Sequence, residues 1–115
     1  MWKNIPDKPK IEEDPGVEFE SAIFAAELGE APEIDLHGET VDAALHDLDR
    51  FLHQELMGGS EVIRIIHGRG NQILHKAIHV WLEKQKKLDL VSYFRDAQNP
   101  REQNAVTYAA LPRLK

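Results

Sequence analysis

The chain has 115 residues, a length typical of one domain built around a single hydrophobic core. It contains no cysteine, which excludes disulfide bonds, a thiolate nucleophile and a cysteine-built zinc site, and which fits the reducing cytoplasm where we expect the protein to be. There is no apolar run of about 18 residues and no signal peptide, so we expect no contact with a membrane.

The net charge of −6 at first argues against binding to nucleic acid, which usually needs a cationic surface. However, the charge is unevenly distributed. Residues 1–32 contain three lysines against eight acidic residues, whereas residues 33–115 contain 11 Lys/Arg against 12 Asp/Glu and hold all six histidines. The acidity therefore belongs to the leader, and the rest of the chain is neutral enough to carry a local basic face.

The leader, residues 1–32, is rich in proline and charge, so most of it is expected to be disordered. A short helix is predicted over residues 18–28, because Phe19, Ile23 and Ala26 recur at helical spacing. This helix would pack either on the rest of the chain or on a partner.

Residues 33–115 alternate strand and helix signals. Amphipathic spacing predicts two helices, and short apolar runs bounded by turn residues predict four strands. In chain order we expect strand 33–36, helix 40–59, strand 60–68, helix 71–87, strand 88–97 and strand 104–113. Thr40 is the expected N-cap of the first helix. The predicted fold is an α/β two-layer sandwich of the order β-α-β-α-β-β.

Two His-Gly pairs follow the first two predicted strands, in "DLHG" (35–38) and "IHGRG" (66–70). If these strands are parallel, both pairs lie at the same end of the sheet, where ligand sites of open α/β sheets form. The sequence therefore predicts one common site.

The second pair continues into a glycine-rich turn before a helix. Gly68 and Gly70 would let backbone N–H groups approach an anion, and Arg69 would add a charged contact to phosphate. Gly38, Arg64, His75 and Lys76 are further candidates for binding nucleic-acid phosphate. The alternative is a tight turn that has no ligand.

His37 and His67 are predicted to act as a proton-transfer pair, because imidazole titrates near neutral pH. Asp35 shares a strand face with His37, so it could orient a histidine, act as a base or hold a metal ion. Alternatively, Asp35 accepts backbone N–H groups while His37 caps a turn.

His75 and His79 stand four residues apart and could bind a metal ion if a third ligand existed. The sequence identifies no such ligand, so we assign no metal site. A solvated helix face is the preferred interpretation, followed by a contact of His75 with phosphate.

The segments "IDLHGETVDAALHDLDRFL" and "EVIRIIHGRGNQILHKAIHVWL" resemble the Smr (small MutS-related) domain family, which pairs a DLHG motif with an HGxG motif. The motifs map to Asp35, Leu36, His37 and Gly38, and to His67, Gly68, Arg69 and Gly70. The resemblance implies a fold similar to the C-terminal domain of translation initiation factor three. It also implies nucleic-acid binding and, in several members, nuclease activity on DNA or on RNA, including messenger RNA on stalled ribosomes. The family often has glycines before a threonine of the last strand, where this sequence has Asn104 and Ala105.

The resulting hypothesis is an endoribonuclease in which Asp35, His37 and His67 transfer protons. RNA cleavage would need no cofactor, since the 2′-hydroxyl can be the nucleophile; Mg²⁺ is the candidate cofactor if DNA is the substrate. A metal-assisted DNA nickase and a non-catalytic module that binds nucleic acid or the ribosome are the alternatives. The acidic leader would dock on a protein partner, with basic ribosomal proteins as candidates.

Overall fold

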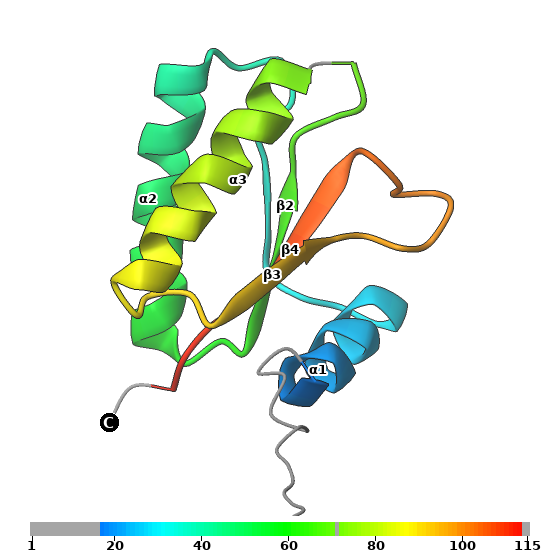
Figure 1. The fold of residues 1–115 in the computed structure, drawn as a ribbon, viewed down its shortest axis with the longest axis vertical. Coiled ribbons are helices and arrows are strands. Elements are labelled where there is room, and N and C mark those ends of the chain that lie inside the picture. Colours follow the sequence, from blue (N-terminus) through cyan, green and yellow to red (C-terminus); the bar gives the residue numbers. More distant parts are fainter. Residues whose placement is uncertain (1–16, 71, 114–115) are drawn as a thin grey trace, which may run out of the picture.

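The structure is a computed structural model that describes residues 17–70 and 72–113 (Figure 1). From residue 33 onward the elements follow the predicted order β-α-β-α-β-β, which confirms the α/β architecture, and a helix at the predicted 18–28 segment precedes them. The predicted disorder of the leader falls largely on residues 1–16, which lie outside the described residues. In chain order the elements are α1 (Val17–Leu28), β1 (Glu33–Asp35), α2 (Val41–Gly58), β2 (Val62–Ile66), α3 (Gln72–Lys87), β3 (Tyr93–Asp96) and β4 (Val106–Ala110).

The four strands form one sheet in the order β1-β2-β4-β3. β1 and β2 are parallel, whereas β4 runs antiparallel to both of its neighbours, β2 and β3. The C-terminal ends of β1, β2 and β3 therefore meet the start of β4 at one end of the sheet. We call this the motif end, because both His-Gly pairs follow strands that finish there.

Helices α2 and α3 lie side by side over one face of the sheet (Figure 1). The main core lies between these layers, where Ile63 and Ile65 of β2 are fully buried. The predicted boundaries of α2 are confirmed: the Thr40 hydroxyl accepts a hydrogen bond from the Ala43 N–H at 3.2 Å, and Gly59 ends the helix with φ 83°. No helix among the described residues is both long enough and apolar enough to cross a membrane.

Helix α1 packs on the opposite face of the sheet, against β4 and β2. Its Ile23 is fully buried in a second apolar cluster with Val62 and Tyr108. Of the two alternatives left open for this helix, packing on the rest of the chain is therefore the one that the structure shows.

Candidate functional site

The two His-Gly motifs meet at the motif end of the sheet. The Leu36 N–H donates to the Ile66 carbonyl at 2.7 Å, which ties the two strand ends together. Gly68 has φ 85°, and a β-carbon added to it would lie only 3.0 Å from the β-carbon of His37. This close approach requires glycine. The predicted convergence of the two motifs is confirmed.

Asp35 and His37 form an exposed hydrogen-bonded pair. Oδ1 of Asp35 lies 2.7 Å from Nδ1 of His37 and also accepts the His37 backbone N–H at 3.1 Å. The hydrogen bond with Asp35 raises the pKa of His37, and the same bond lowers the pKa of Asp35. The side chains are 51% and 69% exposed, so the second ring nitrogen of His37, Nε2, is open to a solvent-borne substrate.

His67 does not join this exposed pair. The residue is 1% exposed, and burial lowers the pKa of its imidazole. Its Nε2 lies 3.0 Å from Oγ1 of Thr107, its Nδ1 lies 3.2 Å from the carbonyl oxygen of Gly68, and its ring stacks on His75. The proton-transfer pair predicted between His37 and His67 is therefore not formed, because the His67 ring points toward β4 and α3.

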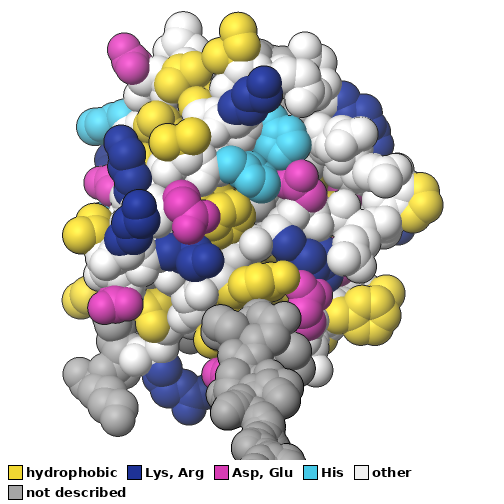
Figure 2. All heavy atoms as spheres, in the orientation of Figure 1, with side chains coloured by type: hydrophobic (Ala, Val, Ile, Leu, Met, Phe, Trp, Pro, Cys, Tyr) yellow, Lys and Arg dark blue, Asp and Glu magenta, His cyan; other side chains and the backbone are white. Residues whose placement is uncertain are grey.

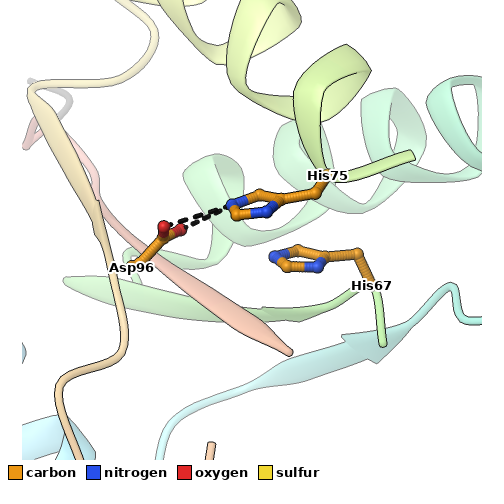
Figure 3. Close-up of side chains that lie close together, drawn as sticks. All are labelled: His67, His75 and Asp96. Atoms are coloured by element: carbon orange, nitrogen blue, oxygen red, sulfur yellow. Dashed lines mark hydrogen bonds and ion pairs between the residues drawn. The ribbon is translucent and has the colours of Figure 1, made fainter. Parts of the chain in front are cut away.

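His67 instead belongs to a histidine cluster, which consists of His67, His75, His79, Asp96 and Thr107. The Asp96 carboxylate lies 3.0 Å from Nε2 of His75 and 2.8 Å from Nε2 of His79, and its Oδ1 accepts the Thr107 hydroxyl at 2.8 Å. Burial opposes ionisation of Asp96, but these hydrogen bonds outweigh it and lower its pKa. Figure 3 shows the stacked rings and the carboxylate, and Figure 2 shows histidine side chains gathered beside an acidic one at the surface.

This arrangement corrects the interpretation of His75 and His79 as a solvated helix face. The His75 side chain is 15% exposed and that of His79 is 31% exposed, and both are turned toward the end of β3. Nε2 of His75 lies 3.0 and 3.1 Å from the two carboxylate oxygens of Asp96, so this nitrogen faces an acidic group of the protein.

Arg69 holds the β3–β4 loop against the turn after β2. Its guanidinium donates to the carbonyl oxygens of Pro100, Arg101 and Gln103, at 3.3, 2.7 and 3.0 Å. These acceptors are neutral, so the positive charge of Arg69 stays available to an anion. The Gly68 N–H donates to Ala105, which leaves Arg69 and Gly70 as the phosphate-binding candidates of the turn.

Asn104 stands in the same loop and adopts the left-handed conformation, with φ 66°. Asparagine tolerates this conformation better than most residues. It thus makes the turn at a position where the family often has glycine, and the following Ala105 carbonyl accepts the N–H groups of both His67 and Gly68.

Arg64 is not part of the site. It alternates with Ile63 and Ile65 along β2, so it lies on the face of the sheet that α1 covers. Its guanidinium forms ion pairs with Glu33 and Glu102. The prediction that Arg64 binds phosphate at the motif end is therefore wrong. Two other predicted candidates, Lys76 on α3 and Gly38 in the β1–α2 turn, are exposed at the surface.

Comparison with known protein families shows which family contains both motifs. The family model described as "Smr domain" matches residues 34–112. The chain belongs to the Smr domain family. The matched segment runs from β1 to just beyond β4 and contains both His-Gly motifs, whereas α1 lies outside it.

The crystal structure of the Smr domain of Thermus thermophilus MutS2 is similar, with a TM-score of 0.65 and 34% sequence identity over 70% of this chain and 98% of that domain. Endonuclease MutS2 of Halothermothrix orenii is 37% identical over 81 residues, 70% of this chain and 10% of the relative. Endonuclease MutS2 of Caldicellulosiruptor saccharolyticus is 32% identical over 111 residues, 94% of this chain and 14% of the relative. The chain thus spans only a small part of these curated relatives.

Sequence reasoning missed Asp96 and Thr107, which complete the histidine cluster in this Smr domain. Asp96 fell within the predicted strand 88–97, where it is the last residue of β3, but it was not a candidate site residue. Thr107 is fully buried in an otherwise apolar strand. A buried hydroxyl needs a hydrogen-bond partner, so a threonine within "AVTYAA" was the available signal of a polar contact.

Proposed function

We propose that this Smr domain is an endonuclease that cleaves RNA at the exposed Asp35–His37 pair. The observation that carries the proposal is the close approach of Gly68 to His37. Because of this approach, the glycine-rich turn lies beside the imidazole of His37, which is hydrogen-bonded to the carboxylate of Asp35. A phosphate held by Arg69, Gly70 and the start of α3 would lie next to that imidazole. Relatives named as endonucleases agree with this class of reaction.

In the proposed reaction, the 2′-hydroxyl of RNA attacks the adjacent phosphorus atom. Its proton passes to Nε2 of His37, while Asp35 holds Nδ1 and stabilises the imidazolium that forms. The bond from phosphorus to the 5′ oxygen breaks, and that oxygen takes a proton from water. The products are a 2′,3′-cyclic phosphate and a 5′-hydroxyl. His67, a predicted catalytic residue, has no role in this scheme because its ring is buried.

A metal-assisted DNA nickase is the second candidate, and the acidic side chains near Asp35 favour it. Burial and then the charges of Asp47 and Asp35 raise the pKa of Glu39, so both of these carboxyl groups lie near that of Glu39. Mg²⁺ is the cation expected to bind such oxygen-rich groups.

The test is cleavage of labelled RNA and DNA of the same sequence, with and without EDTA. RNA cleavage that survives EDTA is expected, with a loss of at least about 100-fold in Asp35→Asn and His37→Ala. His46→Ala, on the exposed side of α2, is the matched control. Cleavage of DNA alone that EDTA abolishes would support the nickase, and binding without cleavage would support a non-catalytic module. Normal cleavage by His37→Ala would show that the active site lies elsewhere.

The leader is proposed to recruit the domain to a protein partner, with basic ribosomal proteins as candidates because residues 1–32 are acidic. Four of the acidic residues and no Lys/Arg lie in residues 17–32. Glu20 and Glu27 among them pair with Arg95, so the test reverses the two exposed charges, Glu18 and Glu30. The double change Glu18→Lys and Glu30→Lys should weaken association with ribosomes and leave cleavage of a free oligonucleotide unchanged. Loss of both activities would contradict the recruitment role.

A further inference from the structure

The histidine cluster has no role in the proposed cleavage, yet it gathers three imidazoles and a carboxylate in one place. We propose that His67, His75 and Asp96 form a binding site for a divalent transition-metal ion of the zinc class, with His79 as a fourth donor. The pair His75 and His79, four residues apart on α3, lacked a third ligand in the sequence. The fold supplies it from the end of β3.

The positions of the donor atoms fit a metal ion. One ligand atom from each of His67, His75 and Asp96 lies within 4.8 Å of the others. Nε2 of His79 lies 2.8 Å from the same carboxylate oxygen that faces His75. Nitrogen and oxygen ligands about 2.0–2.1 Å from a tetrahedral ion lie roughly 3.3 Å from one another. The separations among the ligand atoms of His67, His75 and Asp96 must therefore shorten by up to about 1.5 Å for the atoms to share one coordination sphere.

When His67 is neutral, the cluster does not have enough N–H and O–H protons to make every one of its close contacts a hydrogen bond. The single hydroxyl proton of Thr107 goes to Asp96. A neutral His67 has one N–H, yet its Nδ1 faces the Gly68 carbonyl and its Nε2 faces the Thr107 oxygen. In either tautomer, one of these contacts joins two atoms that have no proton between them. A metal ion bound to Nε2 would remove that conflict.

The surroundings of His67 also match those of a metal-bound histidine. Such histidines donate their second ring N–H to a carboxylate or a backbone carbonyl, which fixes the tautomer and the ring orientation. Nδ1 of His67 lies 3.2 Å from the Gly68 carbonyl, which accepts that N–H and leaves the Nε2 lone pair directed into the cluster.

The donors come from the residue that follows β2, from α3 and from the last residue of β3. The rings of His67 and His75 are stacked 4.3 Å apart and are nearly parallel, as Figure 3 shows, so coordination requires them to tilt toward each other. The terminal torsion of histidine is broad, which makes this rotation accessible. A set of imidazoles with one carboxylate suits zinc and similar ions, whereas Mg²⁺ prefers oxygen ligands.

Metal binding is tested with Zn²⁺ alone, titrated into the full chain after treatment with a chelator. We expect one Zn²⁺ per chain by calorimetry and a higher thermal unfolding midpoint, because an ion that binds only the folded state stabilises it. His75→Gln and Asp96→Asn should each lose at least about 100-fold in affinity, and His79→Gln about tenfold. His46→Gln is the matched control and should bind Zn²⁺ like the wild type.

Far-UV circular dichroism of each variant establishes that it is folded. For the wild type, Co²⁺ provides a second measurement, since a tetrahedral site gives intense visible absorption. Absence of Zn²⁺ binding, full affinity in folded His75→Gln and Asp96→Asn, or a weak octahedral Co²⁺ spectrum would overturn the proposal. Loss of Zn²⁺ binding in Asp35→Asn would also overturn it, by placing the ion at the exposed pair. None of these results depends on whether the domain cleaves RNA.

Discussion

At the scale of single residues, Gly68 determines how closely the two motifs can approach. Replacement with alanine would strain the backbone, whose φ is 85°, and would press a methyl group against the β-carbon of His37 at 3.0 Å. The conformational strain alone is worth roughly 1–2 kcal/mol. We expect Gly68→Ala to lower the free energy of unfolding by at least this amount and to displace His37. Urea denaturation measures the first effect and cleavage kinetics the second.

Gly70 provides the control from the same turn. A β-carbon added there meets no atom within 4 Å, and its φ lies outside the left-handed region. Gly70→Ala should therefore change the free energy of unfolding by less than about 0.5 kcal/mol. Equal stability of the two variants would contradict the structural role assigned to Gly68.

At the scale of elements, the docking of α1 depends on Glu27. Its Oε2 accepts the backbone N–H groups of Gln98 and Asn99 at 2.7 and 2.8 Å, and its Oε1 lies 3.1 Å from Nη1 of Arg95. Glu27→Gln removes the charge from this 5%-exposed side chain. We expect a loss of about 1.5–3 kcal/mol in the free energy of unfolding, the range for hydrogen bonds to charged groups.

Urea denaturation gives this loss, and hydrogen exchange should show faster exchange in α1 and the β3–β4 loop than in α2. Glu18→Gln, an exposed change on the same helix, is the control and should leave both measurements unchanged. If the two variants behave alike, α1 is held by its apolar contacts alone.

The sequence was sufficient to predict the elements and one of the two side-chain groups at the motif end. Hydrophobic periodicity and the Thr40 cap located α2, and parallel pairing of the first two strands was enough to bring His37 near Gly68. The histidine cluster could not be predicted from local sequence patterns, because it depends on the order of the strands in the sheet. Its carboxylate comes from β3, which lies at the far edge of the sheet, beyond β4.

The role of Arg64 was mispredicted for a similar reason. The strand "VIRII" has apolar residues on both faces, so the alternation does not reveal which face holds the arginine until α1 is in place. The amphipathic spacing of Phe19, Ile23 and Ala26 predicted a helix. It left open whether that helix would cover the sheet or a partner.

At the scale of the whole molecule, one arginine-centred network connects α1 to β3, and a second connects β2 to the β3–β4 loop. Arg95 pairs with Glu20 and Glu27, and Arg64 pairs with Glu102. Burial opposes ionisation of the three carboxyl groups, but their hydrogen bonds outweigh it and lower the pKa of each. Folding therefore favours the ionised form of all three groups.

This shift makes the fold sensitive to acid. Because the folded-state pKa values lie below the ordinary value of 4.5, the stabilisation is complete above that value and is lost as the pH falls through the folded-state pKa. As the pH falls below about 6.5, we expect a modest decline in the free energy of unfolding, because the unfolded chain protonates His67 while burial keeps it neutral in the folded state. A steeper fall should follow below about pH 4.5, where the three carboxyl groups are neutralised. Urea denaturation at a series of pH values measures this dependence.

The loss should begin in α1, since its buried carboxylate Glu27 is one of the groups that acid neutralises. Hydrogen exchange followed by mass spectrometry should show that α1 and the β3–β4 loop lose protection at a higher pH than the core under α2 and α3. Glu27→Gln should have a flatter pH dependence than the wild type, because one of the titrating groups is gone. Simultaneous loss of protection in all elements, or an unchanged pH dependence in Glu27→Gln, would show that these networks do not control the acid response.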